Sequence, residues 1–183
     1  MEPDTLNRRE RPNTLVAIPS SLGWMALITS GDLLKQLTFG HSSAEDAIEE
    51  LDPELLEKAE SATQDEQLVG RLQAYAAGTA VDFRDVLVDF GLLKEFNRQV
   101  MHHCRQIPYG ETLTYTQLAA KAGSPQAARA VGRLMAANRV PLIVPCHRVV
   151  SAGGRLGGFS APGGVDVKKR MLELEFSSRR RGL

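Results

Sequence analysis

A chain of 183 residues is long enough for one ordinary domain or for two small lobes that share an interface. Its 43% hydrophobic and 24% charged residues are typical of a globular protein. It has no apolar run near the roughly 20 residues that cross a bilayer as a helix, which excludes a membrane-spanning helix. The net charge of zero conceals an asymmetry between the two halves of the chain. Residues 1–97 carry 8 Lys/Arg and 18 Asp/Glu, a balance of −10, whereas residues 98–183 carry 14 Lys/Arg and 4 Asp/Glu, a balance of +10.

This charge asymmetry has two explanations. A basic half can bind a polyanion such as nucleic acid while the acidic half stays away from it. Alternatively, two oppositely charged halves attract each other within the protein. Charge alone does not decide between these explanations, and the motifs described below favour nucleic acid.

The first 12 residues are polar and charged, and we expect them to be disordered. They lack the apolar core of a signal peptide, so we expect a cytoplasmic protein, or a nuclear one in a eukaryote. Cys104 and Cys146 are too few for a disulfide framework, and neither has the paired spacing of a zinc site. A single bridge between them stays open, but we expect two reduced cysteines and no bound metal.

The N-terminal half begins with strand patterns. Residues 14–41 contain three apolar segments separated by turn signals, which predicts a short antiparallel meander. Residues 43–60 have helical spacing, with Ser43 as the N-cap and a split at Pro53. A second helix is expected over residues 64–77.

The connection between the halves has weaker signals. Val81 and Phe83 suggest a further short strand, and the halves join near residues 89–91. Residues 92–105 predict a helix, because their apolar side chains form one stripe at helical spacing.

The C-terminal half contains a helix-turn-helix pattern. Thr114 and Gln117 form a capping box that opens a helix ended by Gly123. Ser124 is the expected N-cap of the next helix, which extends to about residue 138. Two short helices joined by such a turn fit a helix-turn-helix, although an ordinary helical hairpin looks similar.

The rest of the chain leads to Cys146 and away from it. Residues 140–144 form an apolar run that precedes Cys146, and a glycine-rich loop spans residues 153–164. A last helix is expected over residues 165–176, followed by a basic tail over residues 177–183.

Cys146 and His147 can form a nucleophile and its base. The thiolate is the reactive form of cysteine, and an imidazole oriented by a third group such as a carboxylate can accept the thiol proton. By itself, a Cys-His pair is more often a buried cysteine that packs as a small hydrophobe, since neighbouring side chains often point apart. The consecutive residues His102, His103 and Cys104 spread around a helix and cannot converge on one metal.

The segments around Cys146 occur in a distinctive order. They are residues 107–112 (IPYGET), 114–119 (TYTQLA), 127–132 (AARAVG), 137–138 (AN) and 145–150 (PCHRVV). In this order and spacing they resemble the C-terminal domain of the O6-alkylguanine-DNA alkyltransferases (methylated-DNA–protein-cysteine methyltransferases) over residues 107–175. The N-terminal half resembles that family only in outline.

The resemblance implies DNA repair by a single, irreversible transfer of an alkyl group from O6-alkylguanine to Cys146, and it leaves O4-alkylthymine open as a second substrate. His147 would relay a proton through water to Cys146, and Glu175 would orient His147. Asn138 would brace the turn that carries Cys146. No metal or organic cofactor is implied.

The resemblance also implies how DNA is bound. The helix-turn-helix would enter the minor groove of double-stranded DNA, and Arg129 would fill the gap left when the alkylated nucleotide is flipped out. Tyr115 would help to rotate the nucleotide and would donate a proton to the leaving guanine. The remaining implied contacts to DNA or to the flipped base are made by Ser124, Ala128, Val149, Phe159 and Ser160.

Three features depart from the family pattern. Residues 159–164 (FSAPGG) replace the usual Tyr-Ser/Ala-Gly-Gly with a two-residue insertion and without the tyrosine hydroxyl, so this segment should affect the range of alkyl groups. Residues 92–96 (LLKEF) replace the usual Thr-Pro-Phe-Gln entry to the linker helix. The N-terminal half lacks the cysteines and histidines with which some members bind zinc.

We therefore expect an α+β protein. A small α/β lobe with a short antiparallel sheet would occupy residues 1–90, and a mostly helical lobe with a winged-helix-like helix-turn-helix would occupy residues 91–176. We expect a monomer. The alternatives are an alkyltransferase-like protein that binds the lesion without transfer, and a Cys-His-Glu hydrolase that acts on small amides or thioesters.

Overall fold

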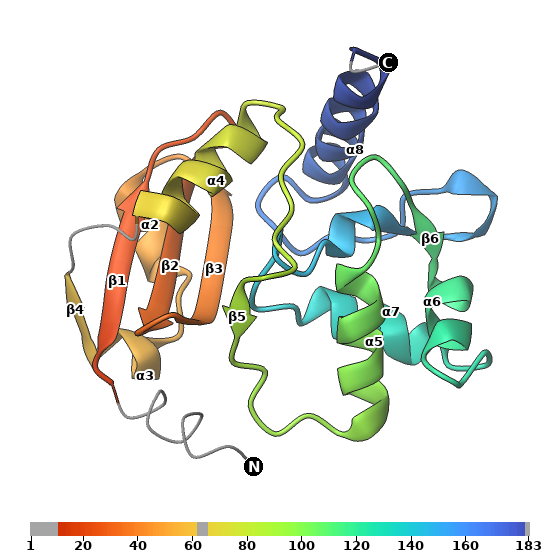
Figure 1. Cartoon of the computed structure of the whole chain (residues 1–183), viewed down its shortest axis with the longest axis horizontal. Helices are drawn as coiled ribbons and strands as arrows, with labels where there is room; N and C mark the ends of the chain where they lie inside the picture. The colour runs from red at the N-terminus through yellow and green to blue at the C-terminus, as the bar shows by residue number, and fades with distance from the viewer. Residues whose placement is uncertain (1–10, 62–65, 182–183) are drawn as a thin grey trace.

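The computed structural model describes residues 11–61 and 66–181. A sheet with its helices lies on one side, and a group of helices that includes α5, α6 and α7 lies on the other, with α8 at the top of the view (Figure 1). The architecture is therefore α+β, as predicted. The predicted disorder of the N-terminus falls largely on residues outside this description. No helix in the described ranges is both long and apolar enough to cross a membrane.

The predicted antiparallel meander is confirmed. Its register places Leu15 opposite Ile28, and Leu27 opposite Leu37. Its strands are β1 (Asn13–Ile18), β2 (Trp24–Ser30) and β3 (Leu33–His41).

Two short edge strands complete the sheet in the order β4-β1-β2-β3-β5. Both pair in parallel, β4 with β1 and β5 with β3. They are β4 (Ala59–Ser61) and β5 (Leu87–Val88). The sheet is therefore mixed, and the expected antiparallel pairing holds for its three central strands.

Pro53 splits the first helical segment, as predicted. Ser43 Oγ caps α2 (Ala44–Glu49) by accepting a hydrogen bond from the Asp46 amide at 3.0 Å, and Pro53 is the first residue of α3 (Pro53–Leu56). The predicted helix does not reach residue 60, because residues 59–61 pair with β1 instead. The next helix, α4 (Glu66–Ala76), ends near its predicted end, whereas its predicted start at residue 64 lies outside the described residues.

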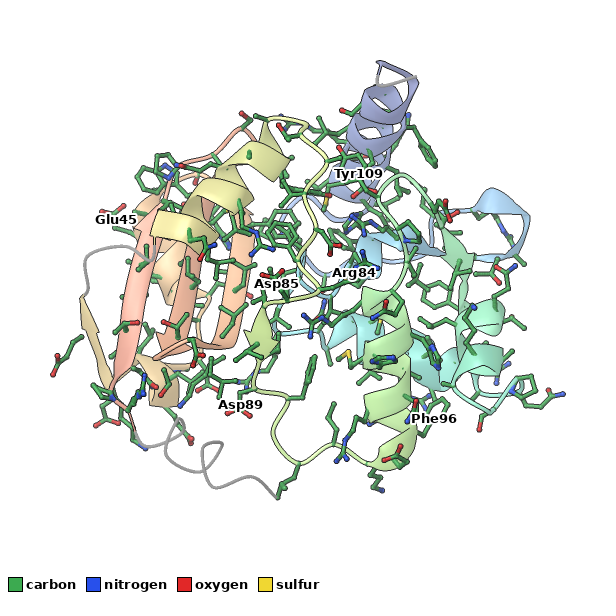
Figure 2. The ribbon with its side chains drawn as sticks, viewed as in Figure 1. Glu45, Arg84, Asp85, Asp89, Phe96 and Tyr109 are labelled. Atoms are coloured by element: carbon green, nitrogen blue, oxygen red, sulfur yellow. The ribbon has the colours of Figure 1, made fainter. Side chains whose placement is uncertain are left out.

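The strand predicted at Val81 and Phe83 is wrong, because β5 begins four residues later. Phe83 is buried in the core, so the packing of its side chain, and not strand pairing, holds this irregular segment in place. Arg105 Nη2 donates to the carbonyl oxygens of Phe83, Arg84 and Val86 at 3.0, 3.1 and 2.7 Å. Figure 2 places Arg84 and the neighbouring Asp85 between the sheet and α5.

The predicted stripe on the linker helix is confirmed by the burial of Val100, Met101 and Cys104 on α5 (Glu95–Arg105). This helix begins three residues later than predicted, and Leu92 before it is fully exposed. The remaining short elements are β6 (Leu113–Thr114), β7 (Val149–Val150), η1 (Cys146–Arg148) and η2 (Ala152–Gly154).

The capping box of α6 (Tyr115–Lys121) is confirmed. Thr114 Oγ1 accepts from the Gln117 amide at 3.1 Å, and Gln117 Oε1 accepts from the Thr114 amide at 2.7 Å. The predicted cap at Ser124 is wrong, because its carbonyl closes a turn with the Ala127 amide at 2.9 Å. The second helix of the pair, α7 (Ala128–Ala136), therefore starts after Ala127, which has no side-chain cap.

The last helix, α8 (Gly164–Arg181), continues five residues past its predicted end. The expected tail over residues 177–183 therefore begins within this helix, and residues 182–183 lie outside the description.

One apolar core joins the two halves of the chain. Phe39 of β3 and Leu72 of α4 belong to the same buried cluster as Val131 of α7 and Met171 of α8. The backbone also connects the halves, since the Leu37 amide donates to the carbonyl of Arg139 at 2.9 Å. The boundary at residue 90 stays a prediction, and the two halves share one interior.

The capping box leads to the first prediction. Thr114→Ala should lower the free energy of unfolding by about 1 kcal/mol, because the N-terminal amides of α6 lose their acceptor. Urea unfolding measures this change. The matched control is Thr116→Ala on the exposed face of the same helix, which should change stability by no more than about 0.5 kcal/mol. Equal effects of the two substitutions would contradict the capping role.

Candidate active site

Cys146 begins η1 at the end of the buried run over residues 140–144. Asn138 braces the turn that leads to it: Nδ2 donates to the Val144 carbonyl at 2.9 Å, and Oδ1 accepts from the Val140 amide at 3.1 Å. Within this turn Leu142 has φ +71°, a left-handed conformation that a leucine adopts only when its surroundings impose it. Asn138 and the buried run supply that constraint, and they fix the position of the Cys146 backbone.

Behind Cys146, η1 and α8 meet at the buried carboxylate of Glu175. His147 Nε2 lies 2.8 Å from Glu175 Oε1, and Arg148 Nε and Nη2 each donate to the carboxylate at 3.0 Å. The Gly110 amide donates to Oε2 at 2.9 Å, and the Tyr75 hydroxyl donates to Oε1 at 2.7 Å. The side chain of Glu175 is fully buried and that of His147 is 1% exposed, so these groups act on one another without solvent screening.

Charge and hydrogen bonding fix the protonation of this cluster. Burial alone would raise the pKa of Glu175, but His147 and Arg148 lower this pKa to about 2, so the group is a carboxylate at neutral pH. Burial lowers the pKa of His147 despite the opposing effect of Glu175, so the imidazole is neutral. A neutral imidazole that faces a carboxylate through Nε2 carries its proton there, which leaves the Nδ1 lone pair free. Nδ1 is buried and has no hydrogen-bond partner among the described residues.

Cys146 is buried, with 4% of the residue exposed. Burial raises its pKa, while a hydrogen bond with Asn138 and the charge of Lys168 oppose this shift. At neutral pH Cys146 is therefore a thiol, and it needs a base when it reacts. The Nδ1 atom of the adjacent His147 has the free lone pair that such a base requires.

A cavity of about 420 Å³ opens beside Cys146. This volume lies within the range of ordinary small-molecule sites, roughly 300–1,000 Å³. Gly157 allows the loop to approach Tyr115, because its φ is +72° and a Cβ there would lie 3.0 Å from the Tyr115 hydroxyl. The lining includes Tyr115, Cys146, Phe159 and Ser160, all of which were predicted for the site, together with Gly132 and Met135 of α7.

A second cavity, of about 220 Å³, borders Cys146 on the side of β3. Phe159 and Ser160 belong to the walls of both cavities, and the inserted residues Ala161 and Pro162 line only the second. Residues 159–162, which belong to the segment that departs from the family pattern, therefore lie between the two cavities that border Cys146.

Lys168 of α8 was not predicted for the site. Its side chain is fully buried, and Nζ donates to the Val149 carbonyl at 2.7 Å and lies 3.5 Å from the Tyr115 hydroxyl. The ammonium also lies 5.7 Å from the centre of the Tyr115 ring and 6.0 Å from that of Phe159. Burial lowers the pKa of Lys168. Val149 was expected to contact the base, but it is not among the residues that line the larger cavity. Its carbonyl accepts from Lys168, and its amide donates to the Cys146 carbonyl.

The helices α6 and α7 and the turn between them, which were predicted to form a helix-turn-helix, carry the remaining predicted residues. Ser124 lies in the turn, Ala128 is the first residue of α7, and Arg129 is exposed on that helix. Arg129 precedes Gly132 by three residues, so the two lie on the same side of α7, and Gly132 lines the larger cavity. Arg129 is therefore close to the side of α7 that borders the cavity.

The sequence analysis missed Arg148, Lys168 and Tyr75, although each had a signal. Arg148 stands within an apolar segment, where a buried arginine requires an acidic partner. Lys168 precedes Glu175 by seven residues, which places both on one face of a helix. Tyr75 lies on the apolar face of α4 and looked like an ordinary core residue.

Within the described parts of the chain, no three His, Cys, Asp or Glu side chains group so as to hold a metal ion. Cys104 is fully buried beside Met135, with 3.7 Å between the sulfurs, whereas His102 is exposed. His102, His103 and Cys104 therefore do not converge.

Comparisons with known proteins identify chains that are similar to this one. The family model for the DNA-binding domain of 6-O-methylguanine DNA methyltransferase matches residues 95–177. The methylated-DNA–protein-cysteine methyltransferase of Methanosarcina acetivorans is 43% identical over 107 residues, which are 58% of this chain and 66% of that protein. That of Mycobacterium tuberculosis is 44% identical over 109 residues, or 60% and 64% of the two chains. The chain thus covers just under two thirds of these relatives.

Two solved structures cover more of the chain. The crystal structure of Mycobacterium tuberculosis O6-methylguanine methyltransferase aligns with a TM-score of 0.74 and 34% identity, over 91% of this chain and 94% of that one. The Mycobacterium tuberculosis protein in complex with DNA aligns with a TM-score of 0.71 and 34% identity, over 88% and 92%. The similarity therefore includes both halves of the chain.

The buried carboxylate leads to the second prediction. Because the pKa of Glu175 is lowered from 4.5 to about 2 on folding, its ionised form contributes roughly 3 kcal/mol of stability above pH 5. This contribution is lost as the pH falls from about 5 towards 2. Glu175→Gln should remove that part of the acid dependence, and it should cost roughly 3–5 kcal/mol at pH 7 because Arg148 stays buried without its partner.

Urea unfolding between pH 7 and pH 3 measures both effects. Glu173→Gln on the exposed face of the same helix is the matched control and should follow the wild-type pH dependence. If Glu175→Gln and the wild-type protein lose stability in parallel as the pH falls, the lowered pKa of Glu175 is contradicted.

Proposed function

Because the chain belongs to the O6-alkylguanine-DNA alkyltransferase (methylated-DNA–protein-cysteine methyltransferase) family, we propose that it repairs DNA by transferring an alkyl group from O6-alkylguanine to Cys146. The observation that carries the proposal is the buried thiol of Cys146 on the wall of a 420 Å³ cavity, next to a histidine with a free Nδ1. Each molecule acts once, because a thioether is not cleaved by any group at the site.

The first step is removal of the thiol proton. His147 Nδ1 accepts it through a water molecule, and the resulting imidazolium is stabilised by the Glu175 carboxylate 2.8 Å from Nε2. Arg148 holds that carboxylate in place with two hydrogen bonds of 3.0 Å. The raised pKa of Cys146 means that the thiolate forms during the reaction rather than before it.

The second step is alkyl transfer. The Cys146 sulfur attacks the alkyl carbon, so that a C–S bond forms while the bond from that carbon to guanine O6 breaks. Tyr115, whose hydroxyl faces the cavity loop and whose pKa is raised by burial, donates a proton to the guanine ring. The thiol proton now on His147 and the proton missing from Tyr115 then balance by exchange with water, so the net step moves one proton from the thiol to the base. The products are a thioether and an ordinary guanine. The chemistry requires no metal or organic cofactor.

The target base must leave the duplex to reach the cavity. Flipping a nucleotide costs a few kcal/mol, which contacts to the phosphate backbone and a side chain in the vacated space offset. The half of the chain with a balance of +10 carries α6 and α7, and Arg129 is exposed beside the cavity. We assign Arg129 to the vacated space, and Ser124 and Ala128 to contacts with the DNA. The partner is double-stranded DNA with an alkylated guanine, bound by a monomer.

The segment that lines both cavities is assigned to alkyl selection. Phe159 and Ser160 face the spaces on either side of Cys146, and Ala161 and Pro162 narrow the smaller one. An alkyl group longer than methyl has to extend from the larger cavity along this segment.

The first test weighs the intact protein after incubation with a methylated duplex. The wild-type protein should gain one methyl group on the peptide that contains Cys146. Cys146→Ser should gain none, and Cys104→Ala should behave as the wild type does. Tight binding without a mass gain would indicate the lesion-binding alternative, and multiple turnover on an activated ester would indicate the hydrolase.

The second test separates base flipping from alkyl transfer. Arg129→Ala should slow transfer from the duplex by roughly tenfold or more, because part of the compensation for flipping is lost. Its rate with the free base O6-methylguanine should not change, since that substrate needs no flipping. Arg98→Ala, an exposed arginine of α5, is the control for general loss of charge. Equal slowing of Arg129→Ala on both substrates would contradict the assignment.

A further inference from the structure

Tyr75 connects the N-terminal half of the chain to the His147–Glu175 pair. It lies on α4 with 1% of its surface exposed. Its hydroxyl donates to Glu175 Oε1 at 2.7 Å and lies 3.1 Å from His147 Nε2. These partners are 100 and 72 residues away in sequence. The pair is therefore completed by a residue from outside the segment that resembles the alkyltransferase domain.

We propose that Tyr75 is a positioning residue for alkyl transfer, which together with Glu175 holds the proton of His147 on Nε2 so that Nδ1 can accept the thiol proton. This inference rests on the proposed function of Cys146 and names a part of its machinery that the N-terminal half supplies.

The direction of the Tyr75 hydrogen bond is fixed by its surroundings. Glu175 is a carboxylate and has no proton to give, and burial next to that charge raises the pKa of Tyr75 well above its usual value. The hydroxyl proton therefore belongs to Tyr75 and points to Glu175 Oε1. The remaining lone pairs of the Tyr75 oxygen face the imidazole.

Two hydrogen-bond acceptors then lie close to Nε2 of His147. Glu175 Oε1 lies 2.8 Å from Nε2 and the Tyr75 oxygen 3.1 Å from it. A proton on Nε2 serves both acceptors, whereas a bare Nε2 would place its lone pair against two electron-rich oxygens. The arrangement selects the tautomer in which Nδ1 is unprotonated, and Nδ1 is the atom without a partner among the described residues.

Ring contacts hold the hydroxyl in this place. The Tyr75 ring meets Phe83 and Tyr109 edge to face, with 6.0 Å between centres in both pairs, and lies 6.3 Å from the His147 ring. Tyr75 comes from α4, Phe83 from the connecting segment and Tyr109 from the C-terminal half. Tyr109 is near α8 in Figure 2, on the side where α4 approaches the helices. Docking of the acidic half is therefore part of assembling the site.

The test uses Tyr75→Phe in the full chain, because phenylalanine keeps the ring and removes only the hydroxyl. The single-turnover rate of methyl transfer from a methylated duplex should fall tenfold to a hundredfold, the size expected for a lost hydrogen bond to a charged group. The Kd for the duplex should not change. Imidazole nitrogen NMR should show His147 protonated on Nε2 in the wild-type protein, and a larger share of the Nδ1-protonated tautomer in the variant, where Glu175 alone holds the proton on Nε2.

The matched control is Tyr109→Phe, which removes a hydroxyl from the same aromatic cluster. That hydroxyl donates to the Gly78 carbonyl at 3.3 Å and not to Glu175. The Tyr109→Phe variant should keep the wild-type rate of methyl transfer and the wild-type tautomer of His147. Equal losses of rate in the two variants, or an unchanged tautomer in Tyr75→Phe, would overturn the positioning role.

The wild-type NMR measurement needs neither substrate nor variant. A wild-type His147 protonated on Nδ1 overturns the inference, even if Tyr75→Phe does not fold. A wild-type protein that transfers no methyl group overturns the proposed function, while the comparison of tautomers between the wild-type protein and Tyr75→Phe still tests whether Tyr75 holds the proton on Nε2.

Discussion

The buried carboxylate of Glu175 is the constraint on which the rest of the site depends. A carboxylate without solvent is tolerated only when its charge is balanced and its oxygens are hydrogen-bonded. Here Arg148 supplies the charge, and the donors come from η1, α4 and the backbone at Gly110. These groups lie far apart in sequence, so satisfying one carboxylate brings together the turn of Cys146, the last helix and the N-terminal half.

The same burial shapes the reactivity of Cys146. Removal from water raises the pKa of the thiol and lowers that of His147, so both groups rest uncharged beside the cavity. A neutral thiol is protected from stray electrophiles, because the thiolate is the reactive form. The proton can leave only towards His147, whose imidazolium form Glu175 then stabilises. Reactivity is thus restricted to a substrate that is already seated in the cavity.

The sequence predicted those features of the fold that depend on interactions between residues close together in the chain. The meander, the cap at Ser43, the split at Pro53 and the capping box of α6 follow from turn and cap residues, and the structure has them. The edge strands, the turn at Ser124 and the length of α8 depend on tertiary pairing and packing, which no local pattern encodes. Within the site, Cys146 and His147 were recognisable from their segment. Tyr75 and Lys168 acquire their contacts from chain far away in sequence, and they looked like ordinary helix residues.

The central claim is that a neutral Cys146 thiol passes its proton to His147 as the alkyl group is transferred. The pH dependence of the single-turnover transfer rate tests it most directly. A neutral histidine with a lowered pKa predicts a rate that is level through neutral pH and falls only below the ordinary imidazole value of about 6.5. A rate that instead rises about tenfold per pH unit up to the alkaline range, following ionisation of the thiol in solution, would contradict the account.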